Sequence, residues 1–467
     1  MSTFYKYAEI LDAANGVPTP EVLAEIIADH MDMNTRTAEN YGRYKQEKEH
    51  TPILTREFEG EAAKKINNKL SNDYFGEIVD TKVGYMFGMP VGIQYDKDAP
   101  GYATAIKAIE RFRKINNLDD LNAEWCKFSS ISGYDAGLCY IDKEGKERVM
   151  RIDPWEAIVI SKTTFTEPEY GLVYYPTWEE NKVCVEFYNA KTKYIFEGAD
   201  FSNLILNTEK TKPHMFNYCP LFGIPNNEEL QGDGDKVFTL IDGFDRAMSD
   251  MNSEIEQFRL AYMIFIGYEP DEETLALMMR TGALYIPTSE DGEKIEWLTK
   301  DLNPAYIDSH LDRLEALIQR FAKHINFTDA AFGSQITGPA MRYKLFALET
   351  KSKYFERKHE AAMLYMFKVI GSAWQTKGFP FDYAMIDCIY TRNIPANLLD
   401  EAQTATALSA IASKRTALSV VSVINDVDEE LRRMEDEKEI YGELDLDNLN
   451  TIPNKDNPEN AGGDLDD

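Results

Sequence analysis

The stretch KVFTLIDGFDRAMSDMNSEIEQFRLAYMIF, residues 236–265, decides the fold of this chain. Val237, Ile241, Phe244 and Met248 recur every three or four residues, which places their side chains on one face of an α-helix. Apolar residues continue to the end of the stretch. It therefore predicts one long amphipathic helix whose apolar face packs against another element.

A short segment that is not a continuous helix follows this stretch, and a second helix comes after it. Residues 268–299 begin with an acidic turn and a short helix, and then contain GALYIPTSEDGEKIEWL, which is typical of two strands joined near 289–292. A helix is predicted next at 304–325. The pattern indicates a small α/β knob between two helices that lie side by side.

The segment FGSQITGPAM, residues 332–341, separates the second helix from a very long helical stretch at 339–374. Gly333 and Gly338 have the glycine spacing of a nucleotide-binding P-loop. The lysine that contacts phosphate and the Ser/Thr that binds Mg²⁺ are absent, because proline and alanine occupy their positions. We therefore interpret the segment as a flexible loop, with Pro339 at the first position of the next helix, where its missing N–H has no cost.

The N-terminal half combines helices with a small β unit. Thr19 can cap a helix over 19–48 that has Pro20 at its first position. Further helices are predicted at 61–88, 102–117 and 119–133. Strands are predicted within 136–160 and at 171–176, 182–188 and 193–197, with a hairpin turn at 143–145. Residues 134–225 therefore form a small mixed β unit in this prediction.

The chain changes character again near its C-terminus. The break RNIP at 392–395 ends the helical pattern, and helices are predicted at 398–413 and 426–440. The last 42 residues contain 16 acidic and four basic side chains, and the segment after 440 has almost nothing to bury. We predict that 441–467 is a disordered acidic tail.

Charge and composition restrict the partners of the chain. Its 467 residues carry a net charge of −30 and 43% are hydrophobic, so cores are expected while adhesion to DNA or acidic lipid is disfavoured. A protein that DNA passes without sticking stays compatible with this charge. The five cysteines lack a CxxC spacing and indicate reduced thiols, and neither a signal peptide nor a membrane span is predicted.

The residue types predict no catalytic group, no metal site and no cofactor. The histidines include no close pair suited to a metal, and the carboxylates of GDGD (232–235) and EPDEE (269–273) are interpreted as solvated turns. Six bases against two acids make residues 339–358 locally basic. This region is either a solvated helix face or a surface for phosphate or an acidic neighbouring subunit. The candidate contact residues are Arg342, Lys344, Lys351 and Lys353.

Several stretches, taken in order, resemble the portal, or head-to-tail connector, proteins of tailed bacteriophages, particularly of siphophages that infect Gram-positive hosts. They are INNKLSNDYFGEIVDTKVGYMFGMPVGIQYD (66–96), GLCYIDKEGKERVMRIDPWEAIVI (137–160), LIDGFDRAMSDMNSEIEQFRLAYMIFIG (240–267), IEWLTKD (295–301) and NFTDAAFGSQITGPAMRYKLFALETK (326–351). The resemblance covers about 60–430 in consistent order. It implies a multidomain, mainly α fold with smaller mixed α/β parts that assembles as a ring.

The resemblance also divides the chain into named parts. They are a wing (1–235), a stem helix (236–267), a clip (268–303), a second stem helix (304–325), a tunnel loop (326–338), a long wing helix with its return (339–394), a crown (395–440) and the tail (441–467). In the tunnel loop, the residues expected to face DNA are Gly333, Ser334, Gln335, Ile336, Thr337 and Gly338. In the clip, the residues expected to face partners are Glu269, Asp271, Glu272, Glu273 and Asp291.

The function implied by the resemblance is a conduit for double-stranded DNA at the portal vertex of the virion, made in the host cytoplasm as a ring of twelve copies. The implied partners are the terminase large subunit, a head-completion or adaptor protein, and the major capsid and scaffolding proteins, with DNA passing non-specifically. Two alternatives stay open: a nucleotide-dependent enzyme that uses 333–338, and an acidic non-viral scaffold or adaptor protein.

Overall fold

The computed structural model describes residues 2–58, 66–162, 165–179, 182–258, 262–266, 271–273, 294–298, 304–325, 338–393, 398–421, 423–424 and 427–441. Within these ranges the chain is mainly helical with smaller sheets, in agreement with the predicted fold class. It divides into two compact units, residues 1–393 and 394–467, and each is described by itself.

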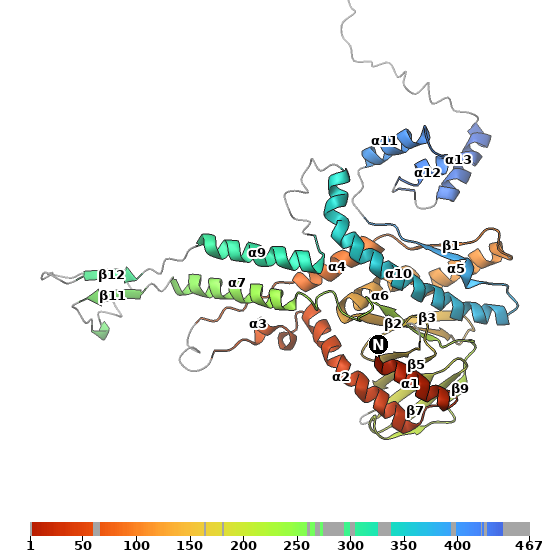
Figure 1. Cartoon of the computed structure of the whole chain (residues 1–467), viewed down its shortest axis with the longest axis horizontal. Coiled ribbons are helices and arrows are strands. Elements are labelled where there is room, and N and C mark those ends of the chain that lie inside the picture. Colours follow the sequence, from red (N-terminus) through yellow and green to blue (C-terminus); the bar gives the residue numbers. More distant parts are fainter. Residues whose placement is uncertain are drawn as a thin grey trace, which may run out of the picture. The chain divides into compact units, whose positions relative to one another are not determined.

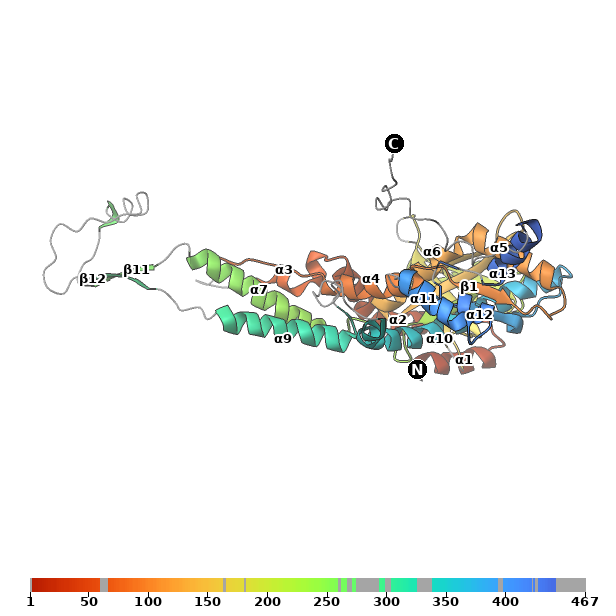
Figure 2. The same cartoon turned by 90° about the horizontal axis from the view of Figure 1, so that it is seen from above.

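Two helices of the first unit, α7 and α9, lie side by side (Figures 1 and 2). α7 spans Phe238–Phe258 and α9 spans Pro304–Ala322. The apolar core that includes their facing sides contains Val237, Ile241, Phe244, Leu311 and Ile318. Burying each such side chain contributes roughly 1.5–3 kcal/mol, so this core holds the pair together. The predicted pair of helices is confirmed.

α7 ends earlier than the helix predicted at 236–265. Tyr262–Ile266 forms strand β11, which pairs antiparallel with β12, Lys294–Leu298. The run YMIFI is apolar, aromatic and β-branched, so a strand is favoured once a partner supplies backbone hydrogen bonds. The strand predicted near 294–298 is confirmed, whereas the predicted turn at 289–292 lies outside the described residues.

The helix predicted at 61–88 is wrong over 66–73, where the chain is extended along α7. The backbone N–H groups of Asn68, Leu70 and Asn72 donate to the side chains of Ser253, Ser249 and Asp245 at 3.0, 2.9 and 3.0 Å. Two extended residues advance about 6.7 Å, close to the 6.0 Å of four helical residues, so alternate amides match one stripe of α7. The asparagines favour this arrangement because their side chains compete with helical hydrogen bonds.

The other helices agree in position with the predictions, and α4 occupies the second half of the helix predicted at 61–88. They are α2 (Pro20–Tyr44), α4 (Tyr74–Phe87), α5 (Tyr102–Asn116), α6 (Leu118–Ser132) and α10 (Gly338–Thr376). Thr19 caps α2, since its Oγ1 accepts a hydrogen bond from the N–H of Val22 at 3.4 Å. Pro339 is the second residue of α10 and still lies in the first turn, where backbone N–H groups have no helical partner. The helices α1 (Ser2–Ala13) and α3 (Pro52–Thr55) were not predicted.

Two antiparallel sheets form the β unit predicted at 134–225. One has the order β10 (Leu221–Pro225), β2 (Tyr134–Ile141), β3 (Glu147–Ile152). The other has the order β4 (Ala157–Ile160), β5 (Tyr170–Pro176), β6 (Val183–Tyr188), β7 (Thr192–Gly198), β8 (Leu204–Leu206), and β9 (Lys212–Pro213) also pairs with β7. Alternation along β5 directs Leu172 into the core with α1 and α2 and Val173 into the core with the first sheet. A further pairing, β1 (Gly92–Tyr95) with β13 (Ile386–Ile389), was not predicted.

The second unit contains three described helices. α11 spans Leu398–Ser409, α12 spans Lys414–Leu418 and α13 spans Val427–Tyr441. The helices predicted at 398–413 and 426–440 therefore exist, and a short helix lies between them. An ion pair of 3.1 Å between Arg415 and Asp428 joins α12 to α13.

The extended segment 66–73 predicts a measurable role for two buried serines of α7. Replacing both Ser249 and Ser253 by Ala leaves the part-buried amides of Leu70 and Asn68 without their acceptors, which costs about 0.5–1.5 kcal/mol for each hydrogen bond lost. We expect a lower midpoint of urea unfolding and faster hydrogen exchange of these two amides. The control is Thr239→Ala, an exposed position on the same helix. Equal stability of the two variants would contradict this role.

Candidate functional site

Three charged side chains meet where the helix pair joins the rest of the first unit. Asp233 precedes α7, Lys351 lies on α10, and Lys82 lies on α4. The Nζ atoms of Lys351 and Lys82 are 3.0 and 3.2 Å from Oδ2 of Asp233. The exposed fractions of the side chains are 13% for Lys351, 6% for Asp233 and 1% for Lys82. One buried carboxylate therefore joins three segments that are far apart in the sequence, and we call these three residues the ionic cluster.

Neighbouring groups complete the contacts of the ionic cluster. Lys82 Nζ donates to Oδ1 of Asn226 at 2.6 Å, and Asn226 Nδ2 donates to Oδ1 of Asp233 at 2.9 Å. The N–H of Asp233 donates to the carbonyl oxygen of Ser130 at 2.7 Å, and the ring of Phe355 lies 4.5 Å from Lys82 Nζ. Burial alone would raise the pKa of Asp233, but the two ammonium groups outweigh it and lower this pKa to about 2. Asp233 is therefore ionised at neutral pH.

Two glycines allow the backbone to bring Asp233 into this position. A Cβ atom on Gly232 would lie 2.4 Å from the carbonyl oxygen of Ile131, and one on Gly234 would lie 2.6 Å from the ring of Phe75. The motif GDGD thus packs directly against neighbouring elements. Its interpretation as a solvated turn is wrong at Asp233, because this carboxylate is buried.

The ionic cluster also closes the C-terminal end of α9. Lys323 has a φ of 54°, and the N–H of His324 bonds back into the last turn at 2.9 Å, which is a Schellman-type ending. Lys351 Nζ donates to the carbonyl oxygen of Ala322 at 3.0 Å. A cation is favourable there because the last carbonyls of a helix carry partial negative charge. Lys351 therefore joins α9 to α10 on the two sides of residues 326–337.

A second group of ion pairs joins α10 to Arg392, which lies close to the C-terminal end of the first unit. Arg392 donates from Nε and Nη2 to the two carboxylate oxygens of Glu349 at 2.8 and 3.2 Å. The Tyr85 hydroxyl donates to the same carboxylate at 2.7 Å. Burial would raise the pKa of Glu349, but these hydrogen bonds outweigh it and lower the pKa. The bidentate contact fixes the returning chain against α10.

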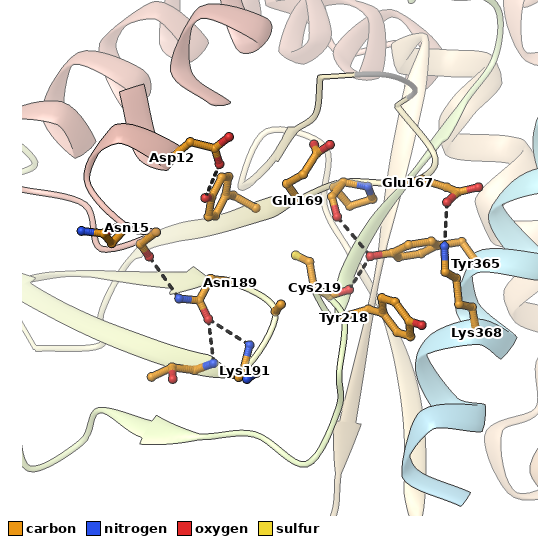
Figure 3. Close-up of a pocket in the computed structure, with 15 residues that line it drawn as sticks. Asp12, Asn15, Glu167, Glu169, Asn189, Lys191, Tyr218, Cys219, Tyr365 and Lys368 are labelled. Carbon is orange, nitrogen blue, oxygen red and sulfur yellow. Dashed lines mark hydrogen bonds and ion pairs between the residues drawn. The ribbon is translucent and has the colours of Figure 1, made fainter. Parts of the chain in front are cut away.

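A cavity of about 590 Å³ separates α1 and the larger sheet from α10 (Figure 3). The Tyr365 hydroxyl lies 3.1 and 3.0 Å from the carbonyl oxygens of Pro168 and Cys219. Lys368 of α10 pairs with Glu167 at 2.9 Å. These direct hydrogen bonds and the ion pair lie in the lining of the cavity, and they tie α10 to the β unit.

Comparisons with known proteins identify the family. Residues 23–443 match the family described as phage portal protein, SPP1 Gp6-like. The chain is 25% identical to the portal protein of Bacillus phage SPP1 over 403 residues, covering 81% of this chain and 78% of that protein. It is 25% identical to the portal protein of Clostridium phage phiCD119 over 407 residues, covering 83% and 88%. A solved structure, the neck of an empty GTA particle, is similar over 72% of this chain and 85% of that chain, at 12% identity and a TM-score of 0.44.

The chain belongs to the SPP1 Gp6-like family of phage portal proteins. The resemblance stated from the sequence is thereby confirmed, including its relation to phages of Gram-positive hosts. The protein is a portal protein and has the role of a head-to-tail connector in the phage virion. None of the helices in the described ranges is long and apolar enough to cross a membrane.

The predicted loop and clip residues of this portal protein are described only in part. Tunnel-loop residues 333–337 and the clip residues Glu269 and Asp291 lie outside the described residues. Gly338, predicted as the last loop residue, is the first residue of α10. The clip residues 271–273 are described and exposed. Their predicted contacts stay predictions.

The basic residues predicted on the long helix do not share one role. Lys351 binds the carboxylate of Asp233 and the carbonyl oxygen of Ala322 within the subunit, and its predicted contact with phosphate or a neighbouring subunit stays a prediction. Lys353 is exposed and pairs with Glu356 at 2.9 Å. The side chains of the other two candidates, 342 and 344, lie outside the part of the chain that the structure describes.

The ionic cluster itself was missed by reasoning from the sequence. One signal was present, because Lys82 occupies an apolar-face position of its helix between Ile78 and Met86. A lysine there must either reach solvent or find a buried anion. The partner could not be identified, because Asp233 follows Lys82 by about 150 residues and GDGD has the composition of an ordinary turn.

Replacing Asp233 by Asn tests the ionic cluster. The variant keeps the shape but leaves two buried ammonium groups without a counter-ion, and we expect a loss of about 3 kcal/mol or more of unfolding free energy. Lys351→Met should be milder, since it removes one charge and leaves Lys82 paired. The control is Asp119→Asn in the exposed pair with Arg113, which should cost less than about 1 kcal/mol.

The pH dependence of unfolding gives a second readout of Asp233. Because its folded pKa of about 2 is below the ordinary value of 3.8, its contribution is present above pH 4 and disappears as the pH falls to about 2. Asp233→Asn should lack this part of the acid transition. An acid transition identical to the wild type would show that Asp233 is not paired.

Proposed function

We propose that this portal protein forms a ring of twelve copies through which double-stranded DNA enters and leaves the capsid. The main support is the family match, which continues without interruption through α7, α9 and α10. The ionic cluster supports the same proposal, because it holds the base of the helix pair rigidly to the body on both sides of the predicted tunnel loop. A conduit needs such a fixed frame around a loop that faces moving DNA.

In this proposal the helices acquire the roles implied by the portal resemblance. α7 and α9 are the stem, 268–303 is the clip, and 326–338 is the tunnel loop. The body before 236 is the wing, which continues into α10, and 395–440 is the crown inside the capsid. The start of the second compact unit at residue 394 is consistent with a separate crown.

The charge of the chain suits passage of DNA better than binding of DNA. Lys and Arg contacts to phosphates release counterions and hold DNA tightly. A ring of chains that each carry −30 presents mostly repulsive surface, so a duplex can slide without being trapped. The proposed partners are the terminase large subunit during packaging, a head-completion or adaptor protein afterwards, and the major capsid and scaffolding proteins. We also propose that this portal protein has no enzyme activity of its own.

The ring can be tested directly on the purified chain. Twelve copies of 53.4 kDa give a particle of about 640 kDa, which mass photometry or negative-stain microscopy would detect. A chain that stays monomeric at all salt and protein concentrations would contradict the proposal.

The tunnel loop can be tested in the phage. Removing four residues within 333–338 should lower the yield of DNA-filled heads by about tenfold or more while ring assembly is unchanged. The same variant tests the alternative of a nucleotide-dependent enzyme, because saturable ATP binding by the wild type that the deletion abolishes would favour it. Normal packaging by the deletion variant would contradict the assignment of the loop.

A further inference from the structure

A pocket beside the ionic cluster holds more positive than negative charge. Its volume is about 290 Å³, and its charged lining residues are Lys82, Lys236, Lys323, Lys351, Asp233 and Glu229. At the floor of the pocket, the carboxylate of Asp233 is the counter-ion of two buried ammonium groups, those of Lys82 and Lys351. At the mouth, Lys236 and Lys323 are exposed and form no ion pair or side-chain hydrogen bond with the described residues.

The excess charge at the floor is only partly offset within the subunit. Lys82 has the amide oxygen of Asn226, and Lys351 has the carbonyl oxygen of Ala322. Among the described residues, Asp233 is the one carboxylate within ion-pair distance of either lysine. A buried ammonium group that shares its counter-ion attracts a further anion, because a buried charge is screened less than an exposed one.

We infer that this pocket receives a side-chain carboxylate from a second copy of the chain and so forms one half of a contact between neighbouring subunits. The inference rests on the proposed ring. The chain supplies 80 acidic residues, so carboxylates are the commonest charged groups on a neighbouring copy. The aromatic side chains of Phe321 and Tyr354 line the pocket and are 52% and 48% exposed, as is typical of residues that protein contacts cover.

A phosphate of duplex DNA fits the same pocket less well. Each phosphate in a duplex is flanked by others, which would lie against the surface of a chain that carries a net charge of −30. A single side-chain carboxylate can enter between Lys236 and Lys323 without this penalty.

The test is charge reversal at the mouth, Lys236→Glu with Lys323→Glu, which leaves the ionic cluster intact. We expect rings to require at least about tenfold more protein, as measured by mass photometry over a concentration series, with the melting temperature of the monomer unchanged. The matched control is Lys114→Glu with Lys143→Glu, which has the same charge change at exposed sites outside the pocket. The double Arg variant at 236 and 323 should assemble like the wild type.

Three results would overturn the inference. One is ring formation by the double Glu variant at wild-type concentrations. Another is normal ring formation with selective loss of DNA retention, which would assign the pocket to phosphate. The third comes from carbodiimide cross-linking of mixed heavy- and light-isotope rings, if Lys236 and Lys323 join only to carboxylates of their own copy. Failure of the wild type to form rings would instead contradict the proposed function.

Discussion

The burial of Asp233 between two lysines is the constraint on which the first unit depends. Displacement of α4, α7 or α10 would separate buried charges, whose Coulomb attraction is stronger than that of charges at a surface. Because Lys351 also binds the last carbonyl of α9, all four helices meet at one fixed point. The pair of Arg113 and Asp119, whose side chains are 34% and 42% exposed, has similar distances but lacks this effect, since water competes for both partners.

A buried ionic group is a poor source of net stability but a strong determinant of position. Dehydrating three charges offsets most of their mutual attraction, so an apolar replacement of the whole cluster could be equally stable. Removing one partner is costly because the others stay buried and unpaired. Such a group keeps the helix pair α7 and α9 in one orientation relative to the rest of the first unit.

Hydrogen bonds between side chain and backbone provide a second kind of support for the helix pair α7 and α9. The amides of 66–73 need acceptors because the segment joins neither a helix nor a sheet. Ser249, Ser253 and Asp245 supply them at a spacing that only a helix running alongside an extended chain can match. This support explains why the helix predicted at 61–88 begins only at Tyr74: the amides that a helix would use are bound by another helix.

The sequence by itself determined the order of the elements, the amphipathic pair α7 and α9, the long helix α10 and the portal family. These features depend on local spacing of apolar residues, on caps such as Thr19, and on motifs in consistent order. The tertiary structure alone decided which charges meet. Lys351 resembled its basic neighbours on one helix, and Asp233 resembled a turn residue, until folding placed them 3.0 Å apart. The reason is physical: helical periodicity repeats within a few residues, whereas an ion pair between distant segments depends on how whole helices pack.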